Sequence, residues 1–239
     1  MQPTETDRRC LLIDAMGTLV RLAPPAPRLR SELARRFGVE VSLEQAQRAI
    51  GEEIRYYRAH MHEGRDAVSV RKLRERCAQV LGAALAPSVD VGAAAPQSAS
   101  RFAGNGLTDA LVASLHFSVY DDVEGTLRTA RSRRWRIVVV SNWDASLAEV
   151  LDRLGLGPLL DQVVTSAGAG ASKPDPAIFL YALDLAGCAP AQALHVGDSL
   201  DEDVRGARAA GIEAVWLDRD GRPAAEGVRT ITTLAHLQL

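Results

Sequence analysis

The stretch from Ile137 to Thr165, IVVVSNWDASLAEVLDRLGLGPLLDQVVT, decides the fold. It opens with a run of β-branched apolar residues, the pattern of a buried strand, and this strand ends at Ser141. Leucine and valine then recur at helical spacing over 147–154, and Gly155 can end that helix. A second short strand follows at 162–165. A strand, a helix and a further strand in this order predict a parallel sheet.

The same alternation continues through the carboxyl-terminal half of the chain. Asp122 can cap a helix, while Asp175, Pro176 and Gly187 are the start and stop signals of another one. A helical segment is predicted over 204–210, and further strands are predicted at 10–13, 193–196 and 214–217. We therefore expect an α/β fold with a doubly wound parallel sheet and helices on both faces.

The strand at 10–13 is separated from the others by a long helical block. Ser42 and Gln45 form a capping-box pattern before an amphipathic stripe, and a second stripe runs from 70 to 84. Residues 86–106 are rich in Ala, Gly, Ser and Pro, which predicts a loop. Because the remaining strands come after this block, it is an insertion. The expected domains are a sheet domain, 1–20 with 120–239, and an α-helical domain, 21–119.

Composition narrows the class of protein. The chain of 239 residues is 47% hydrophobic and has a net charge of −2, which is typical of a globular protein and argues against a nucleic-acid partner. No apolar stretch is long enough for a membrane span or a signal peptide. Cys10, Cys77 and Cys188 are odd in number and far apart, so no disulfide framework is predicted. A reducing compartment, and hence a cytoplasmic protein, is expected; the sequence does not indicate the oligomeric state.

Polar residues follow the predicted strands. Asp14, Ser141 and Asp198 come directly after or at the end of strands, and Lys173 lies in a loop after another. In an open parallel sheet, ligands bind at the carboxyl ends of the strands. Two carboxylates at strand ends can hold Mg²⁺, and a hydroxyl and an ammonium group can receive phosphate oxygens. Each residue alone is more commonly a cap, turn or surface residue, so the prediction of a site rests on the combination.

Four segments carry a family resemblance. They are Ile13-Asp-Ala-Met-Gly-Thr-Leu19, Val140-Ser-Asn142, Ser172-Lys-Pro-Asp-Pro176 and the segment 196–211 that begins Val-Gly-Asp-Ser-Leu-Asp-Glu-Asp. In this order they resemble the four motifs of the haloacid dehalogenase (HAD) superfamily, and the resemblance covers the sheet domain from end to end. The helical insertion resembles the cap that part of this family carries between motifs one and two. The resemblance implies a Rossmannoid core, hydrolase activity, Mg²⁺ as cofactor and a small phosphorylated substrate.

The resemblance also implies roles for individual residues. Asp14 would be the nucleophile, Ser141 would hydrogen-bond the transferred group, and Lys173 would neutralise charge. Thr18 and Asn142 are expected to contact substrate.

The metal ligands follow in the same way. Mg²⁺ would be held by Asp14, by the backbone carbonyl of Met16 and by Asp198, with Asp203 as an acidic neighbour acting directly or through water.

Met16 departs from the pattern of the family's phosphatases, which carry an acid–base Asp at this position. A thioether cannot transfer protons, and one positioned acid–base group contributes about 10²–10⁴ in rate. Three hypotheses follow. The first is hydrolysis of a phosphate ester or acyl phosphate through an aspartyl-phosphate at Asp14. The second is a 2-haloacid dehalogenase, a branch that also lacks the second Asp but lacks the equivalent of Asp198 as well. The third is a catalytically impaired binding or regulatory protein.

Overall fold

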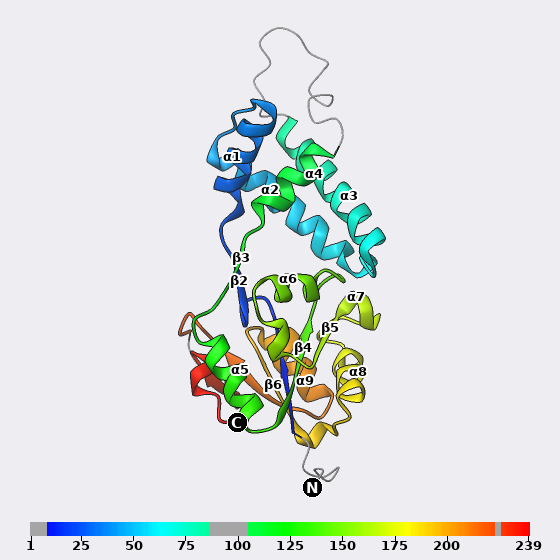
Figure 1. Ribbon diagram of the computed structural model, residues 1–239, viewed down its shortest axis with the longest axis vertical. Coiled ribbons are helices and arrows are strands. Elements are labelled where there is room, and N and C mark those ends of the chain that lie inside the picture. Colours follow the sequence, from blue (N-terminus) through cyan, green and yellow to red (C-terminus); the bar gives the residue numbers. More distant parts are fainter. Residues whose placement is uncertain (1–8, 87–104, 223–225) are drawn as a thin grey trace. The chain divides into compact units, whose positions relative to one another are not determined.

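The computed structural model describes residues 9–86, 105–222 and 226–239. Within them, six parallel strands form one sheet in the order β5-β4-β1-β6-β7-β8 (Figure 1). The strands are β1 Arg9–Ile13, β4 Trp135–Ser141, β5 Gln162–Thr165, β6 Ala193–Gly197, β7 Glu213–Leu217 and β8 Arg229–Ile231. The predicted doubly wound parallel sheet is confirmed. Strand β8 was not predicted, because its three residues contain no apolar run.

The order of the strands creates a switch point between β1 and β6. From β1 the sheet extends through β4 to β5 on one side, and through β6 and β7 to β8 on the other. Ligands of such sheets bind at the carboxyl ends of the strands where the order reverses. Ile13 is in register with Val196, and the Asp14 N–H donates to the Val196 carbonyl at 3.0 Å. The residues that follow β1 and β6 therefore emerge side by side.

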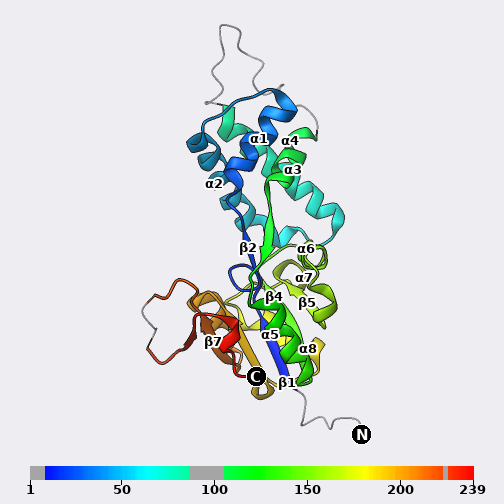
Figure 2. The same cartoon turned by 60° about the vertical axis from the view of Figure 1, so that its left-hand side comes forward.

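Helices cover both faces of this sheet. Cys10 and Leu12 of β1 share one face with alternate valines of β4, and Phe179 packs against them. The helices on this face are α8 Pro176–Ala186 and α9 Gly206–Ala209. On the other face, α5 Val123–Ser132 packs against β4 (Figures 1 and 2). The remaining helices of this part are α6 Leu147–Arg153 and α7 Ser166–Ala169.

The segment predicted as helical over 204–210 begins earlier than expected. A π-helical turn, η7, spans Leu200–Arg205 and continues into α9. The Ser199 hydroxyl accepts a hydrogen bond from the Glu202 N–H at 3.1 Å, so Ser199 caps the turn. The acidic residues after Asp198 therefore lie on a helical turn close to the end of β6.

The cysteines correct the sequence-based expectation. Cys10 and Cys188 form a disulfide, with their Cα atoms 6.5 Å apart and a sequence separation of 178. Helix α8 packs on the face of the sheet to which Cys10 belongs, and Cys188 follows the end of that helix at Gly187. The expectation that no disulfide forms was wrong, and the inference of a reducing compartment loses its support.

Among the described residues, no helix combines the length and apolar character needed to cross a membrane.

The chain separates into two compact units, Met1–Arg21 with Ser118–Leu239, and Leu22–Phe117. The second unit contains α1 Pro25–Phe37, α2 Leu43–His60, α3 Ala67–Leu85 and α4 Gly106–Ser114. The capping box predicted at Ser42 and Gln45 is present. Where the chain passes between the units, β2 Val20–Leu22 and β3 Phe117–Val119 form a small sheet that the sequence did not predict. The predicted loop over 86–106 lies outside the described residues, apart from its ends.

Candidate active site

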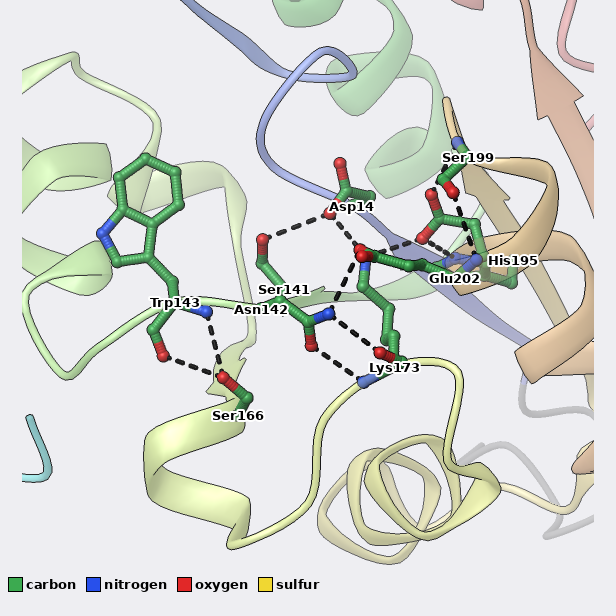
Figure 3. A network of polar contacts seen from close by, with 10 residues as sticks. Asp14, Ser141, Asn142, Trp143, Ser166, Lys173, His195, Ser199 and Glu202 are labelled. Atoms are coloured by element: carbon green, nitrogen blue, oxygen red, sulfur yellow. Dashed lines mark hydrogen bonds and ion pairs between the residues drawn. The ribbon is translucent and has the colours of Figure 1, made fainter. Parts of the chain in front are cut away.

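Asp14 occupies the first position after β1 and is buried, with 4% of its surface exposed. Its Oδ1 accepts hydrogen bonds from the Ser141 hydroxyl at 3.1 Å and from the Lys173 ammonium at 2.6 Å (Figure 3). Its Oδ2 is also buried but has no hydrogen-bond partner among the described residues. Buried carboxylate oxygens are rarely left without a donor or a cation. Oδ2 therefore marks the position where a ligand would complete the site.

Lys173 joins two carboxylates. Its Nζ lies 2.6 Å from Asp14 Oδ1 and 2.6 Å from Asp203 Oδ1, and only 1% of its side chain is exposed. Burial alone would lower the pKa of Lys173, but the Asp14 and Asp203 carboxylates outweigh it and hold that pKa above its ordinary value. The ammonium therefore stays charged at neutral pH and neutralises part of the charge of Asp14.

Asn142 holds the backbone of Lys173. Its Oδ1 accepts from the Lys173 N–H at 2.8 Å, and its Nδ2 donates to the Lys173 carbonyl at 2.9 Å. The same Nδ2 donates to Glu202 Oε2 at 3.1 Å. Figure 3 shows the Asn142 amide facing the Lys173 backbone. The sequence led us to expect a substrate contact at Asn142, whereas the structure engages its amide in fixing the loop that carries Lys173.

Three carboxylates converge at the switch point. Asp14, Asp198 and Asp203 each offer one oxygen, and these oxygens all lie within 4.8 Å of one another. Burial, reinforced by the other two carboxylates, raises the pKa of Asp198 to about 7. Burial also raises the pKa of Asp14, against the opposing effect of Lys173. A divalent cation would relieve this repulsion, and carboxylate oxygens are the ligands that Mg²⁺ prefers, so Asp14 and Asp198 fit that ion, with Asp203 beside them.

Asp203 differs from the other two because both of its oxygens have donors. Oδ1 accepts from Lys173 and lies 3.0 Å from His195 Nε2, and Oδ2 accepts from the Ser199 N–H at 3.0 Å. Although burial opposes it, Lys173 and His195 lower the pKa of Asp203 well below its ordinary range. Asp203 is therefore placed to hold Lys173 rather than to ligate a cation directly. His195 is fully buried within β6, and its contact with Asp203 depends on the fold, so it could not be read from the sequence of β6 alone.

The loop after Asp14 packs tightly on Asp198. Gly17 has a φ of +82°, and a Cβ added there would lie 2.2 Å from Asp198 Oδ2, so only glycine fits. Thr18 is fully buried, and its hydroxyl has no partner among the described residues. Met16, which is partly exposed, forms an isolated bridge with Val20. The structure thus brings the loop that contains Met16 and Thr18 to the same edge of the sheet as the acidic cluster.

Comparisons with known proteins agree with this geometry. The model of the haloacid dehalogenase-like hydrolase family matches residues 9–211. The mouse (Mus musculus) "Haloacid dehalogenase-like hydrolase domain-containing protein 3" is 31% identical, over 96% of this chain and 89% of that protein. The alignments with the bovine and human proteins of that name cover 39% and 51% of those proteins, so this chain matches about half of their length or less.

Two further relatives have names that specify an activity. The phosphoserine phosphatase of Thermus thermophilus is 41% identical over 45% of this chain and 43% of that protein. The crystal structure of a HAD phosphatase from Thermococcus onnurineus superposes with a TM-score of 0.63 at 25% identity, covering 95% of this chain and 94% of that one.

Proposed function

The chain belongs to the haloacid dehalogenase-like hydrolases, and on this premise we propose that it is a Mg²⁺-dependent phosphatase acting through an aspartyl-phosphate at Asp14. The expected substrates are small phosphate esters or acyl phosphates. One observation carries the proposal. Asp14 Oδ2 is buried without a donor, while Oδ1 is held by Ser141 and Lys173 and two further carboxylates lie beside it.

The metal would be held by Asp14, Asp198 and the backbone carbonyl of Met16. When bound, Mg²⁺ would supply positive charge against the phosphoryl oxygens and against the carboxylates. Asp203 would keep Lys173 in place, and its contacts favour an indirect role toward the metal.

In the first chemical step, a carboxylate oxygen of Asp14 attacks phosphorus and the bond from phosphorus to the leaving oxygen breaks. Lys173 and Ser141, which donate to Asp14 Oδ1, would also donate to phosphoryl oxygens as charge shifts onto them. In the second step, water attacks phosphorus, the bond between phosphorus and the Asp14 oxygen breaks, and inorganic phosphate leaves with the protons of the water while the Asp14 carboxylate is regenerated. Phosphoryl transfer is catalysed largely by positioning the reactants and by stabilising the charge of the transition state. The reaction therefore does not depend wholly on an acid–base group.

Met16 limits the choice of substrate. No proton donor is available from that side chain for the leaving oxygen, so alkyl phosphates, whose alkoxide must be protonated, are expected to be poor substrates. Aryl and acyl phosphates release more stable anions and are expected to react faster. The relatives named as phosphatases support phosphate as the transferred group.

A second candidate is a 2-haloacid dehalogenase, favoured by Met16 because halide needs no proton. Asp198 argues against a dehalogenase, because displacement of halide does not require the cation that the acidic cluster fits. A third, non-catalytic candidate rests on Met16 alone.

The deciding experiment measures hydrolysis of an aryl phosphate, an acyl phosphate and a 2-haloacid, each with Mg²⁺ and with EDTA. Phosphate release that requires Mg²⁺ supports the proposal. Release of halide without a metal would replace it by the dehalogenase, and no turnover of any substrate would favour the non-catalytic candidate.

A further inference from the structure

Arg219 follows β7 and makes an unusually complete set of contacts with the loop after Asp14. Its Nε donates to the Gly17 carbonyl at 3.2 Å, and its Nη2 donates to the Thr18 carbonyl at 2.8 Å. The other edge of the guanidinium forms a bidentate ion pair with Asp122, at 2.9 and 3.0 Å. Its face lies 3.8 Å from the centre of the Tyr120 ring. Since only 18% of the side chain is exposed, these contacts determine its position.

The two carbonyls belong to the part of the chain that packs on the acidic cluster. Gly17 has no room for a side chain because Asp198 lies against it, and Thr18 is fully buried. Within the loop, the Gly17 N–H donates to the Val20 carbonyl, while the Leu19 and Val20 N–H groups both donate to the Ala15 carbonyl. Several N–H groups of the loop are thus paired within the loop, whereas the Gly17 and Thr18 carbonyls accept from a side chain that is 202 and 201 residues away in sequence.

The Asp122 side chain binds Arg219 and Thr233 rather than the N–H groups of its own helix. It stands at the amino end of α5, as predicted, but makes no capping hydrogen bond there. Its carboxylate accepts from Arg219, from the Thr233 hydroxyl at 2.6 Å and from the Leu234 N–H at 2.8 Å. These contacts and Arg219 hold the pKa of Asp122 below its ordinary value, although burial opposes them. The ion pair therefore orients the guanidinium with its remaining N–H groups toward the loop.

We infer that Arg219 is a positioning residue for catalysis: its guanidinium fixes the Gly17 and Thr18 carbonyls and so sets the loop that joins Asp14 to the acidic cluster. This inference rests on the proposed function for its effect on turnover, but the order of the loop can be measured without any activity. A planar, forked donor is required because two carbonyls and a carboxylate are bound at once, and the single ammonium of lysine cannot reproduce that geometry.

The test compares four variants. Arg219→Ala removes every contact, and Arg219→Lys keeps the positive charge beside Asp122. Asp122→Asn weakens the ion pair and the contacts to Thr233 and Leu234, but leaves the Arg219 donors to the loop. Arg222→Ala is the matched control, because Arg222 is an exposed arginine of the same segment whose Nε donates to Asp218 at 2.8 Å. The readouts are kcat and KM for an aryl phosphate, the melting temperature, and amide hydrogen exchange of the peptide 15–20.

The expected results separate positioning from stability. Arg219→Ala and Arg219→Lys should lower kcat by about 10- to 100-fold, as a misplaced site does, with little change in KM, and should speed exchange in 15–20. Asp122→Asn should lower the melting temperature and, because it weakens the orientation of the guanidinium without removing its donors to the loop, should change kcat and exchange less than the Arg219 variants do. Arg222→Ala should change none of the loop readouts.

The inference is overturned if the Arg219 variants match Asp122→Asn in melting temperature and match Arg222→Ala in both kcat and exchange. Should Arg219→Ala fail to fold, Arg219→Lys against Asp122→Asn makes the same comparison. If the wild type has no phosphatase activity, amide hydrogen exchange of the peptide 15–20 still tests the inference. Faster exchange in the Arg219 variants supports the role of Arg219 in positioning the loop, and unchanged exchange rejects that role.

Discussion

The carboxyl edge of the sheet and the core of the helical unit bury ionisable groups in opposite ways. At the edge, four buried ionisable residues are linked in a row by ion pairs and hydrogen bonds: Asp14 to Lys173, Lys173 to Asp203, and Asp203 to His195. Among the described residues of the helical unit, Glu53 is the one buried charged side chain. Its pKa is raised by burial, and the Cys77 thiol opposes this only in part.

The two regions differ in whether the buried carboxylates have partners that stabilise their charge. A buried carboxylate costs free energy unless a cation or several donors accompany it. The sheet edge supplies Lys173 between two carboxylates, so that charge is retained at the place where chemistry is proposed. The partner of Glu53 is the Cys77 thiol, which is only a weak donor. The protonated, neutral form of Glu53 is therefore favoured. The following variants test whether this contrast between the two regions is functional.

Asp14→Asn should have the largest effect. An amide is a poor nucleophile and a weaker metal ligand, so kcat for an aryl phosphate at saturating Mg²⁺ should fall by roughly 10⁴-fold or more, as for other covalent nucleophiles. The side chain keeps its shape, so circular dichroism should be unchanged. Turnover comparable with that of the wild type would mean that the sheet edge works without a covalent intermediate on Asp14.

Lys173→Met should affect both activity and stability. Loss of the ammonium should lower kcat by about 10²–10³-fold, because charge on the transferred group is no longer neutralised. It also leaves Asp14 and Asp203 buried without their cation, which should lower the free energy of unfolding by roughly 3–5 kcal/mol.

The chain provides a matched control for this variant. Lys72 is the other of its two lysines and is exposed on α3 in the helical unit. Lys72→Met should change neither quantity measurably in denaturant unfolding and steady-state kinetics. Equal effects of the two variants would remove the distinction between the regions.

Met16→Asp should raise activity rather than lower it. If the missing proton transfer limits the reaction, the gain should be large for an alkyl phosphate and small for an aryl phosphate. Its upper bound is the ~10²–10⁴ typical of one positioned acid–base group, and the observed gain should be smaller because the surroundings accommodate a thioether. A folded variant with no gain on either substrate would favour the non-catalytic candidate.

Mg²⁺ binding should depend on pH through Asp198. Its pKa rises from 3.8 to about 7 in the folded protein without metal, so the folded state binds a proton that the unfolded state has released. Between these values the free energy of unfolding of the metal-free protein should fall as pH rises, and it should level off above about 7. Calorimetry should show Mg²⁺ affinity rising about tenfold per pH unit up to that point, with release of a proton. Asp198→Asn should weaken this dependence and leave the part that comes from Asp14, whose pKa is also raised.

Glu53→Gln should have the smallest effect. Because burial raises the pKa of Glu53, the folded state favours the protonated carboxyl, and stability is lost as pH rises above the ordinary value of 4.5. The glutamine variant should be more stable than the wild type at alkaline pH, by on the order of 1 kcal/mol in urea unfolding. Its kcat should equal that of the wild type. A large loss of turnover would show that the buried carboxyl of the helical unit also has a functional role.

The sequence by itself determined the elements whose signals are local. The valine run before Ser141 is the core of β4, and the signals at Asp175, Pro176 and Gly187 bound α8. These patterns act between residues a few positions apart, so they can be read without knowing the fold. Resemblance to the family then related Asp14 and Asp198 to one site, which the neighbouring positions of β1 and β6 explain.

Only the tertiary structure decided the partners of the polar groups. Cys10 meets Cys188 because α8 packs on one face of β1, and the Asp122 carboxylate binds Arg219 because the segment after β7 passes the residue that precedes α5. Donors from three segments occupy both oxygens of Asp203, although its position in the motif suggested a metal ligand. The physical reason is the same in each case: a buried polar group must find its partner in space, and the packing of strands and helices determines which distant residue is close enough.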